Sequence, residues 1–324
     1  MSNFDPSVRI NRRRALALGG GVAAGGMLSA ASPLTATAAT LRREHRRQQG
    51  TLPVEKIQRI VQAQGTVTKG VLSIDIERLD MPKVAGPLGV MFRPDFELNG
   101  SLTFQPLGHD YAIFNGNTPA LKPQECEPVI DAIIRNGLKF EAFHQHYIET
   151  RPNVWFIHFR GEGNPLNLAR AVHNVLKATS TPLPQTKPSH PTTPLDPDRL
   201  ASILHGSAQV GSEGVVMSTI DRTDKIVIDG IHVSPELNIS TDVEFKPTSS
   251  SGSRAWGAPD FSMTSSEVQP VVSLMRKQGW FVSCLYNQET NEHPQLYFAH
   301  MLKEGDAYTL AREIRRGLNL TATK

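Results

Sequence analysis

The feature that most constrains this chain is an internal repeat. Residues 125–176 align without a gap with residues 267–318, and 13 of these 52 positions are identical. Upstream the match continues more loosely, with Phe104-Gln-Pro106 against Phe245-Lys-Pro247. Self-similarity at a fixed offset is typical of a duplicated structural unit. We therefore expect two copies of one domain, which a chain of 324 residues can accommodate.

A proline-rich segment separates the two copies. Residues 180–197 hold six prolines among mostly polar residues, a composition that favours an extended, semi-rigid linker over a helix or a central strand. The predicted organisation is a first repeat unit over 53–179, a linker over 180–197 and a second repeat unit over 198–320.

Hydrophobic spacing predicts the same elements in each unit. In the first, helices are expected near 54–61, over 124–136 ending at Gly137, and from Asn164-Pro165 to about residue 177. Strands are expected over 70–77, 89–98, 101–106, 111–115, 139–147 and 154–160. The predicted fold class is α+β: two repeated α/β sandwich units with mostly antiparallel sheets and helices packed on one side.

The N-terminal residues resemble an export signal. Three arginines at 12–14 precede a weakly apolar, glycine-rich stretch over 15–31, and Ala36-Thr37-Ala38 fits a cleavage site of small residues. We predict a twin-arginine signal peptide over 1–38, a basic flexible tail over 39–52 and a secreted or extracytoplasmic location. The stretch is too short and too rich in glycine for a membrane span, so no transmembrane segment is expected.

The charge of the chain belongs to this signal. The whole chain carries a net charge of +3, and residues 1–38 contain four arginines and one aspartate. The remainder is balanced, with 30 basic and 30 acidic residues. A nucleic-acid partner is therefore not expected, because binding a polyanion needs a basic surface.

The candidate chemistry lies in one predicted hairpin. Side chains alternate along a strand, so His144 and His146 share a face of strand 139–147, and His158 can join them from strand 154–160. Three imidazoles suit a divalent metal, zinc first and copper or iron as alternatives, with an open position for water or substrate. The carboxylates of Glu162, Glu149 or Asp110 could orient the ligands or transfer protons, and Glu141 could also take this role. The alternative is that these histidines are satisfied core residues.

The repeat itself bears on that choice. His144 and His146 correspond to Tyr286 and Gln288, whereas His158 corresponds to His300. This pattern predicts one chemically equipped unit and one degenerate copy, with a possible shared structural role for His158 and His300. Cys126 and Cys284 occupy non-equivalent positions, and the sequence leaves open whether they pair.

Several strings resemble the LppY/LpqO family of exported bacterial proteins, a domain of unknown function. They are Phe143-His-Gln-His146, Phe156-Ile-His158, Gly161-Glu-Gly-Asn-Pro165 and Leu168-Ala-Arg170. The resemblance covers most of residues 55–320 and implies export and a repeat architecture, with no settled activity. The chain departs from the family pattern at Thr150, where the family has a glutamate that Glu292 supplies in the second unit. It also departs at Glu162 and Asn164, where the family has histidine and aspartate.

Two functions from different classes follow. The first is an exported metal-dependent hydrolase or lyase that acts on a cell-envelope or extracellular small molecule, with His144, His146 and His158 as ligands. The second is a non-catalytic envelope protein that binds a ligand or partner between its repeats. No G-x-S-x-G, Walker A, H-E-x-x-H or C-x-x-C motif occurs in the sequence, so a serine hydrolase has no support.

Overall fold

Two six-stranded antiparallel sheets with helices form the described part of the chain, which in this computed structural model comprises residues 50–81, 83–188 and 190–323. The predicted signal peptide over 1–38 and residues 39–49 of the predicted tail lie outside these ranges. Six α-helices occur in the described residues: α2 Val54–Val61, α3 Pro123–Arg135, α4 Pro165–Leu176, α5 Pro197–Leu204, α6 Ser265–Lys277 and α7 Ala307–Leu318.

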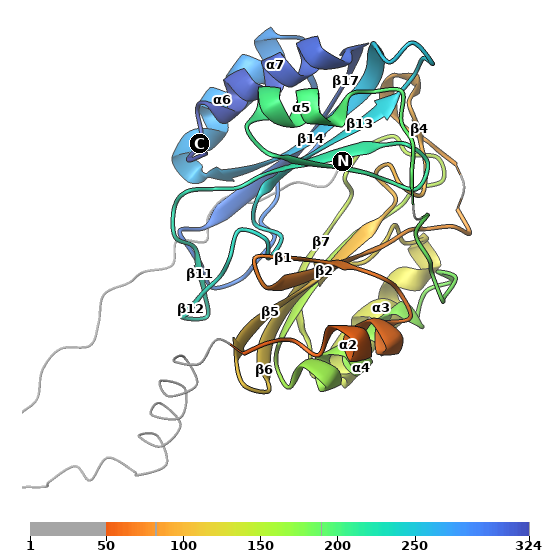
Figure 1. Ribbon diagram of the computed structural model, residues 1–324, viewed down its shortest axis with the longest axis vertical. Helices are drawn as coiled ribbons and strands as arrows, with labels where there is room; N and C mark the ends of the chain where they lie inside the picture. Colours follow the sequence, from red (N-terminus) through yellow and green to blue (C-terminus); the bar gives the residue numbers. More distant parts are fainter. Residues whose placement is uncertain (1–49, 82, 189, 324) are drawn as a thin grey trace, which may run out of the picture. The chain divides into compact units, whose positions relative to one another are not determined.

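The two sheets have the same topology (Figure 1). The first has the order β1-β2-β5-β6-β8-β7 and the second the order β9-β10-β13-β14-β17-β15, so each strand has a counterpart at the same place. The strands of the first are β1 Thr66–Thr68, β2 Val71–Ile76, β5 Gly100–Gly108, β6 Tyr111–Asn117, β7 Lys139–His144 and β8 Phe156–Gly163. Those of the second are β9 Ser207–Val210, β10 Val216–Ile220, β13 Thr241–Pro247, β14 Arg254–Thr264, β15 Phe281–Val282 and β17 Leu296–Asp306. The predicted α+β class is confirmed, with one half for each copy of the repeat.

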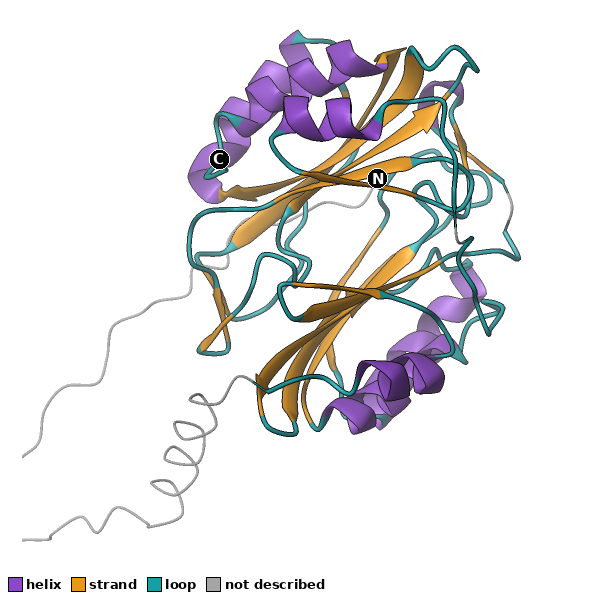
Figure 2. Ribbon diagram, viewed as in Figure 1, coloured by secondary structure: helices purple, strands orange, loops and turns teal. Residues whose placement is uncertain are grey.

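Each sheet is covered by its three helices on one face only (Figure 2). Alternate strand residues point to that face, and they form one buried apolar cluster with the helices of the same unit. Phe104, Phe114 and Phe159 lie in the first cluster, and Phe245, Phe261 and Met301 lie in the second. The alternate residues on the opposite faces are therefore free to carry polar groups, and several of these line the cavity described below.

The same buried ion-pair network recurs in both units. The guanidinium of Arg78 lies 2.7 Å from Asp80 and 2.6 Å from Glu125, and it donates a hydrogen bond to the carbonyl oxygen of Ala120. Arg222 makes the equivalent contacts with Asp224, Glu267 and the carbonyl oxygen of Ser262. Both arginine side chains are fully buried. In each copy the network joins the segment after β2 or β10 to the first turn of α3 or α6.

Polar and apolar contacts join the two units. Arg160 on β8 lies 2.6 Å from Asp229 and 3.2 Å from Glu289, both in the second unit, and 2.9 Å from Glu141 in its own. A third apolar cluster combines residues of both units, among them Phe92, Phe156 and Leu302. The described part of the chain thus has a core between its units as well as one within each.

The strand predicted over 89–98 is wrong. This segment holds the 3-10 turn Pro87–Gly89 and the short strand β4 Met91–Phe92, which pairs with β3 Val84–Ala85. Its apolar residues resemble a strand because Phe92, Phe96 and Leu98 are buried, but an irregular backbone inserts them into the core between the units. Three further short strands of the second unit, β11 Val227–Ile228, β12 Ile231–His232 and β16 Glu292–His293, form a separate small sheet.

The proline-rich segment leads from α4 to the start of α5 at Pro197. It packs on the first unit, because Gln185 forms a bridge with Ala63 and its side chain donates to the carbonyl oxygen of Glu77 at 2.7 Å. Cys126 and Cys284 are free thiols. Among the described helices, none has the length and apolar character needed to cross a membrane.

Candidate metal centre

The hairpin of β7 and β8 brings the three predicted histidines together. His144 ends β7, His146 lies two residues beyond it, and His158 faces Ala142 across the β7–β8 pair. Each imidazole offers a nitrogen atom that lies within 4.8 Å of the nitrogens offered by the other two. Strand alternation and one tight pair of strands are sufficient to produce this arrangement.

A second group extends the cluster across the two units. Glu97, His146 and His300 also offer ligand atoms within 4.8 Å of one another. The Oε2 atom of Glu97 lies 3.3 Å from Nδ1 of His146 and 3.7 Å from Nδ1 of His300. On its other side, Nε2 of His300 lies 3.6 Å from a carboxylate oxygen of Asp260. His146 is common to both groups, so the two form one continuous cluster.

The imidazole nitrogens of this cluster have few partners. Both ring nitrogens of His144, His158 and His300 are buried and make no hydrogen bond within the described residues. The side chains of His158 and His300 belong to residues only 4% exposed. A buried polar atom without a partner costs on the order of 1–3 kcal/mol, so six such atoms at one place call for a ligand. Ligation of a metal ion would satisfy one nitrogen of each ring.

Burial keeps these histidines neutral. It lowers the pKa of His158 and of His300 to about 3, and it lowers the pKa values of His144 and His146 well below the usual range. Neighbouring imidazoles add to the effect at His144 and His146 because like charges repel. The neutral imidazole is the form that binds a metal, so the site is prepared for a cation at neutral pH.

Two carboxylates lie against the imidazoles. Burial raises the pKa of Glu97 well above its usual range, and the nearby carboxylates of Glu244 and Asp260 raise it further. Burial and Asp242 similarly raise the pKa of Asp260, although Tyr286 donates a hydrogen bond to its Oδ2 atom at 3.2 Å. Each carboxylate would ionise more easily beside a bound cation, because an opposite charge stabilises the ionised form.

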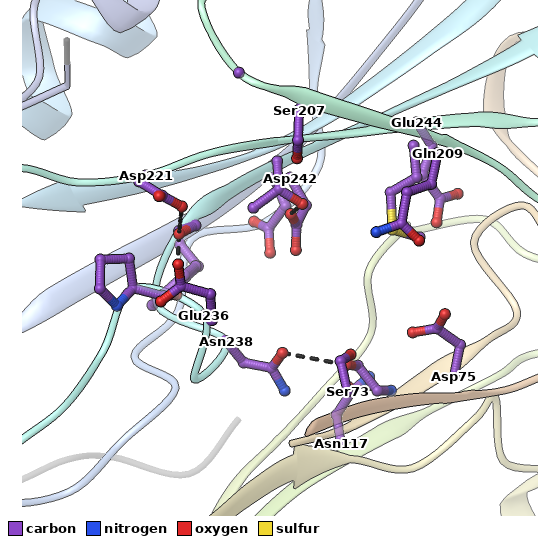
Figure 3. Close-up of a pocket in the computed structure, with 18 of the residues that line it drawn as sticks. Ser73, Asp75, Asn117, Ser207, Gln209, Asp221, Glu236, Asn238, Asp242 and Glu244 are labelled. Carbon is purple, nitrogen blue, oxygen red and sulfur yellow. Dashed lines mark hydrogen bonds between the residues drawn. The ribbon is translucent and has the colours of Figure 1, made fainter. Parts of the chain in front are cut away.

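The cluster borders a cavity of about 730 Å³ that is lined by residues of both units. His146, His158 and His300 are part of its wall. Polar side chains form much of the remainder, and Figure 3 shows Ser73, Asp75 and Asn117 of the first unit opposite Ser207, Gln209, Asp242 and Glu244 of the second. A pocket of this size can hold a small organic molecule next to the histidines.

The carboxylates predicted to assist the histidines lie elsewhere. Asp110 is exposed at the β5–β6 turn, 3.2 Å from His109, and the strand register separates it from His158 by roughly 20 Å. Glu149 is exposed beyond the end of β7. Glu162 lies four residues after His158, roughly 13 Å along β8, and 3.8 Å from Arg160. Glu141 also pairs with Arg160.

Sequence reasoning missed Glu97 and Asp260, which take the places expected for those carboxylates. Glu97 has a left-handed backbone with φ 64°, and its repeat counterpart Asn238 has φ 56°. Few non-glycine residues adopt this conformation, so the two copies share an unusual turn, but the differing residue types give no sign of it in the sequence. Asp260 could not be found either, because it reaches His300 only through the β14–β17 pairing.

The second unit contributes to the cluster instead of being only a degenerate copy. Tyr286 stacks on the ring of His144 with 3.7 Å between ring centroids, and its hydroxyl contacts Asp260. Gln288 donates to the carbonyl oxygen of Asn238 at 2.7 Å, where His146 of the first unit contacts Glu97. His300, which was expected to have a structural role, lies within 4.8 Å of two other potential ligands.

Fold and site together define a duplicated α+β protein with a buried histidine–carboxylate cluster between its two copies. Comparison with protein families agrees with the duplication: the family described as Domain of Unknown Function (DUF1259) matches residues 55–178 and again residues 198–320. The chain belongs to this family. No curated protein and no solved structure matches the chain.

Proposed function

We propose that the cluster binds a divalent metal ion and that the protein is a metal-dependent hydrolase or lyase acting on a small molecule in the cavity. The observation that carries the proposal is a set of six buried imidazole nitrogens on His144, His158 and His300, which have no hydrogen-bond partner among the residues that the structure describes. Core histidines normally satisfy at least one nitrogen, so the alternative of structural histidines leaves this set unexplained.

The ligand set favours zinc, with copper or iron as alternatives. His144, His146 and His158 supply three imidazoles from one hairpin, a set that leaves a coordination position for water or substrate. Glu97 and His300 flank His146 and could complete the coordination or orient the ligands. Oxygen-preferring ions such as calcium fit less well, because nitrogen donors dominate the cluster.

The residues around the ion would support proton transfer. A divalent ion supplies Lewis-acid activation of water or of a substrate carbonyl or phosphoryl oxygen. Glu97 lies 3.3 Å from His146, and Asp260 lies 3.6 Å from His300, so either carboxylate could accept a proton at the site. These two residues replace Glu162, Glu149 and Asp110 as our candidates for the general base.

We further propose that the protein is exported by the twin-arginine route and acts on a cell-envelope or extracellular ligand. The support is the sequence of residues 1–38, with its arginine cluster and small-residue cleavage pattern. The strings that resemble the LppY/LpqO family are consistent with this location.

A non-catalytic ligand-binding protein is the second candidate. The polar lining of the cavity extends over strands of both units, well beyond the histidines, and that observation favours binding of a ligand whether or not a reaction follows. A metal could then hold the ligand without converting it.

Calorimetric titration of zinc into chelator-treated full-length protein tests the metal proposal. We expect tight binding by the wild type and by His109→Ala, whose histidine is exposed, and a loss of about a hundredfold or more in His158→Ala. Circular dichroism checks that each variant is folded. Equal zinc affinity in wild type and in folded His158→Ala would contradict the assignment.

An activity screen separates the enzyme from the binding protein. We expect zinc-dependent turnover of at least one compound from a panel of small esters, amides, phosphoesters and glycosides, abolished by chelation and by His158→Ala. Tight zinc binding together with ligand binding and no turnover across the panel would favour the second candidate.

A further inference from the structure

The wall of the cavity is strongly acidic. Seven carboxylate side chains line it, against one lysine and one arginine. Ionised carboxylates in a low-dielectric cavity cost free energy unless cations neutralise them. The cationic groups near these side chains therefore indicate which carboxylates still need a partner.

The two cationic side chains are already engaged. The ammonium group of Lys69 lies 2.8 Å from Asp221 and 2.7 Å from Glu236. Arg222 pairs with Asp224 and Glu267 in the buried network of its own unit. Neither is therefore free to bind an anionic ligand such as a phosphate ester.

Four lining carboxylates have no lysine or arginine within ion-pair distance among the described residues. They are Glu97, Asp242, Glu244 and Asp260. Glu97 and Asp260 adjoin the histidines, where a metal ion would neutralise them. Asp242 and Glu244 lie outside both potential metal groups. Burial raises the pKa of Asp242 to about 6 and that of Glu244 to about 8, so a further cation beside them would favour their ionised forms.

The fold points these two carboxylates in one direction. Asp242 and Glu244 are two residues apart on β13, so they share a face of the sheet, and Asp242 lies opposite Asp260 on β14. Asp242 accepts a hydrogen bond from Thr219 at 2.7 Å, and Glu244 accepts one from the backbone nitrogen of Glu97 at 2.9 Å. Each carboxylate can accept further bonds, since two oxygens offer about four acceptor positions.

His158 and His300 of the candidate metal centre line the same cavity as Asp242 and Glu244. Their buried ring nitrogens have no hydrogen-bond partner in the described part of the chain. Elsewhere in the lining, Ser73, Asn117, Ser207 and Gln209 offer hydroxyl and amide groups, which suit a hydroxylated molecule (Figure 3).

We infer that the cavity binds a small organic ammonium ion, whose charged nitrogen lies against Asp242 and Glu244 while its reacting group lies at the histidines. The inference rests on the proposed function, because it names the ligand class of the same site. Ammonium groups supply donors as well as charge, and both match what the two carboxylates lack.

Paired probes test the inference on full-length protein. Glucosamine and glucose differ in the amine, glucuronate carries the opposite charge, and spermidine is an ammonium ion without a sugar ring. By calorimetry we expect at least one of the two amines to bind about tenfold or more tightly than glucose, and glucuronate to bind most weakly. Binding of both amines no tighter than that of glucose would overturn the inference.

A double variant locates the charge. Asp242→Asn with Glu244→Gln should lower amine affinity about tenfold or more, whereas Glu304→Gln, at a partly exposed carboxylate outside the cavity lining, should leave it unchanged. Unchanged amine affinity in the folded double variant would overturn the inference.

Metal content measured on the same samples distinguishes the two proposals. Bound metal without amine preference defeats only the ligand class. Amine binding without metal defeats only the metal centre.

Discussion

The two repeat units share a framework and differ at the residues that face each other. In the first unit the inner hairpin carries His144 and His146; in the second, the same positions carry Tyr286 and Gln288. His158 and His300 are common to both, and each lies in the shared cavity. The two copies thus share one fold, whereas the side chains on their facing surfaces differ and line a common cavity.

The buried ion-pair networks around Arg78 and Arg222 are the clearest feature that the two units share. Arg78 and Arg222 are fully buried, and each is matched by two carboxylates and a backbone carbonyl oxygen. Loss of one partner in such a network leaves an uncompensated charge, which is strongly destabilising. The facing surfaces carry no such restriction, because a cavity tolerates different side chains.

The largest effect on stability is expected when the buried arginine of either unit is removed. Arg78→Ala and Arg222→Ala should each lower the free energy of unfolding by about 3–5 kcal/mol, because each removes a fully buried side chain and leaves two largely buried carboxylates without their guanidinium partner. Urea denaturation measures this. Arg135→Ala, which removes an exposed i,i+4 pair with Asp131, is the control and should cost about 0.5 kcal/mol or less. A large effect in one unit alone would show that the networks are not equivalent.

The next prediction exchanges the facing residues. His144→Tyr with His146→Gln gives the first unit the residues of the second, and we expect zinc affinity to fall about a hundredfold or more. The reciprocal pair, Tyr286→His with Gln288→His, should not create a second zinc site, because its third imidazole would be His300, which already lies in the group with Glu97 and His146. Calorimetry on both variants measures this, and a second bound zinc in the reciprocal pair would show that the second unit can form a metal site of its own.

A smaller effect concerns pH. Hydrogen bonds and charge from Arg78 and Lys122 outweigh burial and lower the pKa of Asp80 from 3.8 to about 2. The resulting stabilisation is fully present above pH 3.8 and is lost as the pH falls through 2, and it amounts to about 1–2 kcal/mol. Asp80→Asn should lose this stabilisation at pH 7 and show a flatter dependence of unfolding free energy between pH 4 and pH 2. An unaltered pH profile would exclude this role for Asp80.

The smallest prediction tests equivalent helix caps. Asn164 accepts hydrogen bonds from the backbone nitrogens of Leu166 and Asn167 at the start of α4, and Asp306 accepts one from Thr309 at the start of α7. Alanine at either position should cost about 1 kcal/mol, measured by thermal unfolding. Costs that differ by more than about 1 kcal/mol would show that the caps have diverged as the site has.

Much of the fold could be predicted from the sequence because each helix and strand pattern occurs once in each copy of the repeat. The helix beginning at Asn164-Pro165 and the hairpin of 139–147 with 154–160 follow from local patterns, namely a cap, a proline and alternation. The segment 89–98 could not be predicted, because its burial depends on the other unit and its backbone follows no periodicity.

The site was predictable only as far as a single hairpin. His144, His146 and His158 meet through alternation, which is local. Glu97 contacts His146 within the first unit, Asp260 contacts His300 within the second, and Glu97 and His300 meet across the two units. No spacing in the sequence encodes these contacts. Asp110 was a plausible partner in sequence, but its strand carries it to the far end of the sheet.

The most direct test of the central claim is elemental analysis of the purified full-length protein. We predict about one divalent transition-metal ion per chain after equilibration with zinc, retained in His109→Ala and largely lost in folded His158→Ala. Folded wild-type protein that holds no stoichiometric metal after the same treatment would contradict the account.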